Sequence, residues 1–112
     1  MHDDLHPWTT VCQLEDILPD TGVCARLGEH HVAVFRLADD RLFAIDNRDP
    51  KSGVSVLSRG LVGSLGERTV VASPLYKNHI DLATGEGVED PALSVATWAV
   101  RLQDGAVQLL GR

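Results

Sequence analysis

Two polar motifs contain the residues best suited to chemistry in this sequence. The motif NRDP (residues 47–50) follows the apolar run 42–45 after one residue, Asp46, and the motif SPLYK (residues 73–77) follows the apolar run 70–72. Asn47, Asp49, Ser73 and Tyr76 supply amide, carboxylate, hydroxyl and phenol groups, which form hydrogen bonds or act as hard oxygen ligands. Ser73 lies outside any nucleophile-elbow context. The motifs therefore favour hydrogen bonding over nucleophilic catalysis, and we assign no catalytic residue.

The thiols and the other imidazoles do not indicate a metal site. Cys12 and Cys24 are the only cysteines, and neither has a Cys or His at a zinc-finger spacing. We interpret both as buried, reduced side chains in strands, because small apolar thiols are common in protein interiors. The pair His30-His31 has no third ligand nearby and is interpreted as a solvated turn. We therefore predict no metal-binding or cofactor-binding residue.

Short β-rich runs must position the two motifs. Apolar and β-branched residues gather in runs bounded by Gly, Asp or Pro, which is typical of strands. The expected elements are strands at 22–27, 31–37, 41–45, 70–72, 79–82, 97–102 and 106–110, and one helical turn at 14–18. Asp104-Gly105 favours a hairpin between the last two strands. The sequence therefore predicts an all-β fold.

Two long connections, 46–69 and 83–96, are rich in Gly, Pro, Ser and charged residues. Compact β domains rarely keep such segments without a use, so we interpret them as the working loops. The spaced glycines of 60–66 lack the Lys-Ser/Thr of a phosphate-binding loop and are interpreted as a flexible part of the first loop. With 112 residues, the chain is expected to form one domain, 1–112, with a loop-rich subdomain at about 46–90.

Composition excludes several classes of protein. The net charge of −6 argues against a general nucleic-acid binder, which needs a basic face. No apolar run approaches the ~18 to 20 residues of a membrane-spanning helix. The first seven residues, MHDDLHP, are acidic where a signal peptide is basic and then apolar. We therefore expect a cytoplasmic protein.

The two polar motifs resemble the cluster-binding loops of Rieske proteins. The second loop of that family reads Cys-Pro-x-His, followed by an apolar-Asp-apolar strand and a Thr-Gly turn, and residues 73–85 (SPLYKNHIDLATG) follow this pattern except at the ligands. NRDP stands where Rieske proteins have Cys-x-His. The resemblance implies a Rieske-like antiparallel β-sandwich, with a small loop-rich subdomain in place of the cluster-binding region.

The resemblance places Asn47 and Asp49 at the first Cys and His positions, and Ser73 and Tyr76 at the second pair. A Rieske [2Fe–2S] centre needs two thiolates and two imidazoles, so these vestigial positions imply that no cluster binds. NRDP, the Ser-rich stretch 54–60 and SPLYK together are similar to the small subunit of NAD(P)H-dependent nitrite reductase. The resemblance extends over most of the chain.

Tyr76 raises a structural question at this emptied site. Protein interiors are close-packed, and a void left by a lost cluster would destabilise the loops. Our hypothesis is that the Tyr76 ring fills this volume, with its hydroxyl near Asp49 or near a loop amide. The alternative is an exposed aromatic residue on the loop surface.

Basic residues are concentrated around the loops. Residues 47–77 carry a net charge of +3, or +2 if Asp46 is included, while the rest of the chain carries −9. In a Rieske-like fold these loops converge, so we expect a basic tip that docks on an acidic patch of a partner. The candidate contact residues are Arg48, Lys51, Arg59, Lys77 and His79. For His79, a structural role at a strand edge is the competing interpretation.

The resemblance implies a cofactor-free subunit of an oxidoreductase rather than an independent enzyme. The expected partner is the large nitrite reductase subunit, which in this family carries sirohaem, an iron–sulfur cluster and flavin and reduces nitrite to ammonium in nitrate assimilation. Two alternatives stay open: a Rieske-type ferredoxin that carries electrons, and a stand-alone small-molecule-binding or sensor domain on the same fold.

Overall fold

The computed structural model describes residues 8–111, which form three antiparallel three-stranded sheets. The sheets have the strand orders β1-β9-β8, β2-β3-β4 and β5-β6-β7. The strands are β1 (Trp8–Gln13), β2 (Thr21–Leu27), β3 (His30–Arg36), β4 (Leu42–Asp46), β5 (Leu61–Leu65), β6 (Arg68–Ala72), β7 (His79–Asp81), β8 (Val100–Gln103) and β9 (Ala106–Leu110). Three short 3-10 helices, η2 (Leu14–Asp16), η3 (Leu57–Arg59) and η4 (Pro91–Leu93), lie in the connections. The all-β antiparallel class expected from the sequence is confirmed.

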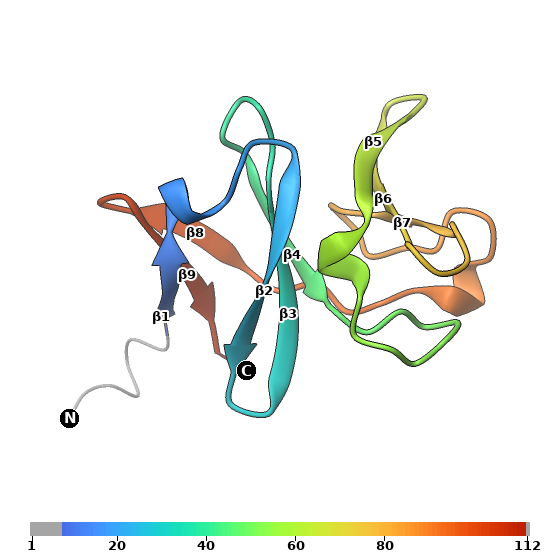
Figure 1. Cartoon of the computed structure of the whole chain (residues 1–112), viewed down its shortest axis with the longest axis horizontal. Helices are drawn as coiled ribbons and strands as arrows, with labels where there is room; N and C mark the ends of the chain where they lie inside the picture. The colour runs from blue at the N-terminus through green and yellow to red at the C-terminus, as the bar shows by residue number, and fades with distance from the viewer. Residues whose placement is uncertain (1–7, 112) are drawn as a thin grey trace.

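The middle sheet, β2-β3-β4, packs on both of its faces. The sheet β1-β9-β8 lies on one side of it and the sheet β5-β6-β7 on the other (Figure 1). Successive side chains of a strand point to opposite faces. Val32 and Val34 of β3 therefore enter one apolar cluster with Trp98, whereas Ala33 and Phe35 enter a second. This arrangement explains why β3 reads as a continuous apolar run instead of alternating with polar residues.

The second apolar cluster holds the small sheet and its loops against the middle sheet. It joins strands β3, β4, β6 and β7 to helix η3, and its members are Ala33, Phe35, Ile45, Leu57, Val71, Ile80 and Leu82. Phe35 lies directly over Gly22 of β2. A Cβ at Gly22 would stand 2.6 Å from Cε1 of Phe35 and 2.9 Å from the carbonyl oxygen of Ser58, so only glycine permits this approach.

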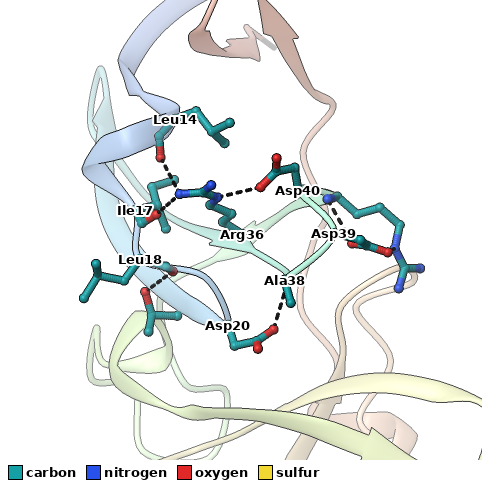
Figure 2. A network of polar contacts seen from close by, with 10 residues as sticks. Leu14, Ile17, Leu18, Asp20, Arg36, Ala38, Asp39 and Asp40 are labelled. Carbon is teal, nitrogen blue, oxygen red and sulfur yellow. Dashed lines mark hydrogen bonds and ion pairs between the residues drawn. The ribbon is translucent and has the colours of Figure 1, made fainter.

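A polar network centred on Arg36 fixes the connections at one end of the middle sheet (Figure 2). The Arg36 guanidinium donates to the carbonyl oxygen of Ile17 at 2.8 Å and to the Asp40 carboxylate at 2.9 Å. Asp20 accepts a hydrogen bond from the amide of Ala38 at 3.0 Å. The segment around η2 is thereby tied to the β3–β4 turn.

Most expected strands are present, with boundary shifts at the last hairpin. The expected strand 97–102 begins only at Val100, although Thr97 forms an isolated bridge with Ile45. The helical turn expected at 14–18 is η2. No helix within residues 8–111 is long and apolar enough to cross a membrane. The acidic segment 1–7, on which the export prediction depended, lies outside the described residues.

Two sequence interpretations are wrong. Residues 61–65, assigned to a flexible loop because of the flanking glycines, form strand β5, which pairs with β6 from Leu61–Ala72 to Leu65–Arg68. Gly66 closes this hairpin with a φ of +61°, a conformation suited to glycine. The cysteines are not buried: Cys12 is partly exposed, and Cys24 of β2 is exposed.

Candidate functional site

Asp49 is the centre of the loop region, the name used here for residues 46–90. Its side chain is fully buried. Four groups donate hydrogen bonds to the carboxylate: the Ser73 hydroxyl at 2.9 Å, the Lys51 amide at 3.1 Å, the Ser52 hydroxyl at 3.2 Å and the Asn78 side-chain amide at 3.4 Å. One buried anion therefore joins the first polar motif to the second.

Asn47 performs a similar task on the other side of the first motif. It is almost fully buried, and its side-chain oxygen accepts a hydrogen bond of 2.7 Å from the amide of Ser58. Its backbone carbonyl oxygen accepts from the amides of Val56 and Leu57, at 3.0 Å each, and its own amide donates to the carbonyl oxygen of His31. Asn47 thereby holds η3 against β3. Its side-chain nitrogen lies 3.5 Å from the sulfur of Cys24.

The second motif forms a tight turn that is closed by backbone hydrogen bonds. The amide of Lys77 donates to the carbonyl oxygen of Ser73, and the amide of Ser73 donates to the carbonyl oxygen of Asn78, both at 2.9 Å. Lys77 adopts a φ of +58°. This conformation is energetically unfavourable for residues other than glycine. The turn maintains it because both of its ends are hydrogen-bonded.

The hypothesis that Tyr76 fills the core of the loops is wrong. Its side chain is 55% exposed, and the ammonium of Lys51 lies 4.9 Å from the centre of its ring. Asp49 and its hydrogen-bond partners occupy the buried volume between the two motifs. A carboxylate can be buried there because four hydrogen bonds compensate for its loss of water. Tyr76 and Lys51 instead form a cation–π pair on the surface.

The basic residues of the loop region differ in their partners. Arg68 pairs with Glu86 at 2.7 Å and more distantly with Asp81 at 3.7 Å. The other four, Arg48, Lys51, Arg59 and Lys77, form no ion pair within residues 8–111. All four are exposed. His79 is already engaged, because its Nδ1 lies 2.5 Å from the Glu89 carboxylate and its amide donates to the same group at 2.8 Å.

Three partners at this site were missed at the level of sequence. Ser52 and Asn78 hold Asp49, and Glu89 holds His79. Asn78 lies within the loop pattern used for the resemblance, so a polar residue directly before a strand was an available signal. Ser52 and Glu89 lie in long connections where the sequence gives no pairing rule. The side-chain oxygen of Asn78 is buried and has no hydrogen-bond partner among residues 8–111.

The chemical groups at the vestigial positions do not fit a [2Fe–2S] cluster. Such a cluster needs thiolate and imidazole ligands, and the four positions hold Asn47, Asp49, Ser73 and Tyr76. The Asp49 oxygens already accept four hydrogen bonds, and the Ser73 hydroxyl is used as one of the donors. Within residues 8–111, no group of three or more His, Cys, Asp or Glu side chains is arranged to hold a metal ion. The site is therefore built for hydrogen bonding.

The Asp49 carboxyl titrates below its usual range. Burial alone raises its pKa, but the hydrogen bonds from the Lys51 amide, Ser73, Asn78 and Ser52 together outweigh burial and hold the pKa below the usual range of an Asp carboxyl. A depressed pKa stabilises the folded state above the unfolded value, and this stability is lost as the pH falls through the folded value.

We therefore expect the loop region to lose stability in acid through Asp49. As the pH falls from neutral through the folded-state pKa of Asp49, the stability difference between the wild type and an Asp49→Asn variant should shrink, because the variant has no proton to gain at this site. Urea denaturation at a series of pH values measures this difference. A difference that stays constant down to the lowest pH would contradict a charged Asp49.

Comparison with known proteins places the chain in a family. Residues 7–110 match the family model described as a Rieske-like [2Fe-2S] domain. The chain is 48% identical over 105 residues to the nitrite reductase (NADH) small subunit of Escherichia coli (strain K12), a match that covers 93% of this chain and 97% of that protein. The chain belongs to the nitrite reductase small-subunit family. The resemblance drawn from the two polar motifs is thereby confirmed.

Two further relatives extend this placement. The solution structure of the E. coli protein NirD superimposes with a TM-score of 0.86 at 48% identity, over 93% of this chain and 96% of that one. A protein of Klebsiella oxytoca named nitrite reductase [NAD(P)H] large subunit is 41% identical over 111 residues, which cover 95% of this chain and 12% of that protein. In K. oxytoca a domain of this family is therefore part of a much longer polypeptide.

Proposed function

We propose that this chain is the cofactor-free small subunit of a cytoplasmic NADH-dependent nitrite reductase. It binds the large subunit and stabilises or positions it, and its own residues carry out no redox step. In this proposal the sirohaem, the iron–sulfur cluster and the flavin belong to the large subunit. The observation that carries the proposal is the Asp49 network, which keeps both loops in shape with side chains that offer no ligand to a cluster.

The K. oxytoca relative supports the choice of partner. One polypeptide there contains a domain like this chain within a protein named as the large subunit. Joining two domains in one chain gives them a high effective concentration, which is useful when they act together. The same two domains on separate chains must find each other through a binding surface.

Co-purification and an activity assay test this proposal together. The chain, used as bait in an extract of nitrate-grown cells, should retain a much larger flavin- and haem-containing polypeptide. Adding the chain to that polypeptide should raise its nitrite-dependent NADH oxidation or slow its inactivation. If the large subunit is neither retained nor affected, the proposed function is wrong.

The unpaired cations of the loop region are the proposed contact surface for an acidic patch of the large subunit. Arg48 and Lys77 are exposed and form no ion pair within the described part of the chain, so their charge is available to a partner. Reversing both charges, Arg48→Glu with Lys77→Glu, should slow association by about tenfold at low salt and weaken its salt dependence. Stopped-flow or surface-based kinetics at several ionic strengths measure both effects.

Arg26→Glu, compared with the single variants Arg48→Glu and Lys77→Glu, supplies a control with the same change of net charge, because Arg26 is an exposed cation of β2 outside the loop region. Its reversal should leave the association rate within about twofold of the wild type. Equal effects at Arg26 and at the loop cations would mean that only the net charge of the chain matters.

A further inference from the structure

A groove of about 380 Å³ lies on the face of the β5-β6-β7 sheet that points away from the second apolar cluster. It lies where β5 begins and β6 ends, beside the turn of the second motif. Its lining residues are Arg59, Gly60, Leu61, Ala72, Ser73, Pro74, Lys77 and His79. Ser73 also belongs to the Asp49 network, whereas the other lining residues take part in neither the Asp49 network nor the Arg36 network.

Strand register explains why the floor of the groove is apolar. Leu61, Ala72 and His79 are cross-strand neighbours and form one row on the sheet. The adjacent row, Val62, Val71 and Ile80, faces the apolar cluster, so the first row must face outward. Leu61 is 80% exposed, which makes it the most exposed large hydrophobic side chain of the described residues.

Most of the exposed large hydrophobic side chains of the described residues lie in the loop region. Five of the seven exposed large hydrophobic side chains in the described structure belong to it, namely Val54, Leu61, Leu65, Leu75 and Tyr76. An exposed apolar patch with a polar border is typical of a protein-binding surface. Of these five side chains, Leu61 lines the groove.

Two cations stand at the rim of the groove. Arg59 extends from η3, and Lys77 from the turn of the second motif. Neither forms an ion pair within residues 8–111. The third ionisable group, His79, is held by Glu89, whose charge offsets part of the positive rim on that side. The unbalanced positive charge therefore lies at Arg59 and Lys77.

The groove is formed before any partner binds. Gly60 lets the chain pass directly against β6, because a Cβ at this position would lie 2.3 Å from the carbonyl oxygen of Ala72. The hydrogen bond from the Lys77 amide to Ser73 fixes the opposite wall. A preformed site has little ordering entropy to lose when a partner binds.

We propose that this groove binds an acidic segment of the large subunit, with an apolar side chain on the floor and carboxylates beside Arg59 and Lys77. The inference rests on the proposed function and names the chemistry of the contact. Charge complementarity selects the occupant: two unpaired cations flank an apolar floor, so a matching segment carries Asp or Glu next to a Leu-like or Phe-like residue. The apolar contact would slow dissociation, and the charges would speed association.

Binding of the full-length chain to the large subunit tests the groove. Leu61→Asp and Arg59→Glu should each weaken binding by about tenfold, because each introduces a carboxylate facing an acidic partner. Leu102→Asp on β8 and Arg26→Glu on β2 are matched controls outside the loop region and should bind within about twofold of the wild type. All four positions are exposed, so folding should be preserved, as circular dichroism would verify.

The outcomes separate this inference from the proposed function. If the wild type binds and the groove variants bind as well as the controls, the groove assignment is wrong while the proposed function stands. If the wild type does not bind, the proposed function fails first. A photo-crosslinker at position 61 should capture an acidic, apolar peptide of the large subunit. Capture of a second copy of this chain, or of a basic peptide, would overturn the inference.

Discussion

Replacing Asp49 by alanine should lower the free energy of unfolding of the loop region by about 3 kcal/mol. The substitution removes the common acceptor of four hydrogen bonds and leaves the hydroxyl of buried Ser73 without its partner. Urea denaturation measures the loss. Hydrogen exchange should locate it at the Gly53 and Lys77 amides, which close the two turns by donating to the carbonyl oxygens of Asp49 and Ser73, respectively.

Two variants serve as controls for this prediction. Asp49→Asn keeps the shape of the side chain, but its amide NH2 group is a donor and faces some of the groups that donate to Asp49. The loss of stability should therefore be intermediate. Tyr76→Ala, at an exposed position of the neighbouring turn, should change stability by less than about 0.5 kcal/mol. If Tyr76→Ala proves as damaging as Asp49→Ala, the loops do not depend on the Asp49 network.

Replacing Phe35 by alanine should cost about 3–5 kcal/mol, the largest loss expected for any single substitution considered for this chain. Phe35 is fully buried and packs over Gly22 within the cluster that holds the small sheet to the middle sheet. Its removal leaves a cavity at that junction. Thermal or urea unfolding measures the loss, and binding to the large subunit should fall as the loop region separates.

Phe43→Ala is the matched comparison for Phe35. The two residues are direct cross-strand partners on β3 and β4, but Phe43 is only partly buried. Its loss should therefore be about half as large, because less apolar surface returns to water. Equal losses of unfolding free energy in the two variants would mean that Phe35 is not the main contact between the small sheet and the middle sheet.

The fold could be predicted because local pattern and tertiary structure agree along most of the chain. The runs that became β2, β3 and β4 are rich in β-formers and are bounded by Gly or Asp, so the hairpins are visible locally. Strand β5 was missed because Gly60, Gly63 and Gly66 suppress the β signal. Those glycines serve close packing at Gly60 and the hairpin turn at Gly66, needs that depend on neighbours distant in the sequence.

The site was predictable in its position but not in its internal arrangement. The order of the two motifs placed the loops, and chemistry alone showed that Asn47, Asp49, Ser73 and Tyr76 offer no cluster ligands. Which side chain filled the interior was decided by hydrogen bonding across 24 residues, between Asp49 and Ser73, and no local pattern encodes such a pairing. The sequence suggested Tyr76 because its side chain is larger than that of Asp49. Side-chain volume alone does not show that polar groups are present to donate hydrogen bonds to a buried carboxylate.

Iron and acid-labile sulfide analysis of the chain, purified anaerobically from cells grown on nitrate, tests the central claim most directly. If the two loops are held by the Asp49 network, the preparation should be colourless and contain iron and sulfide far below one equivalent per chain. A red-brown protein with stoichiometric iron and sulfide would show that a cluster holds the loops, and the role of a passive partner would then be wrong.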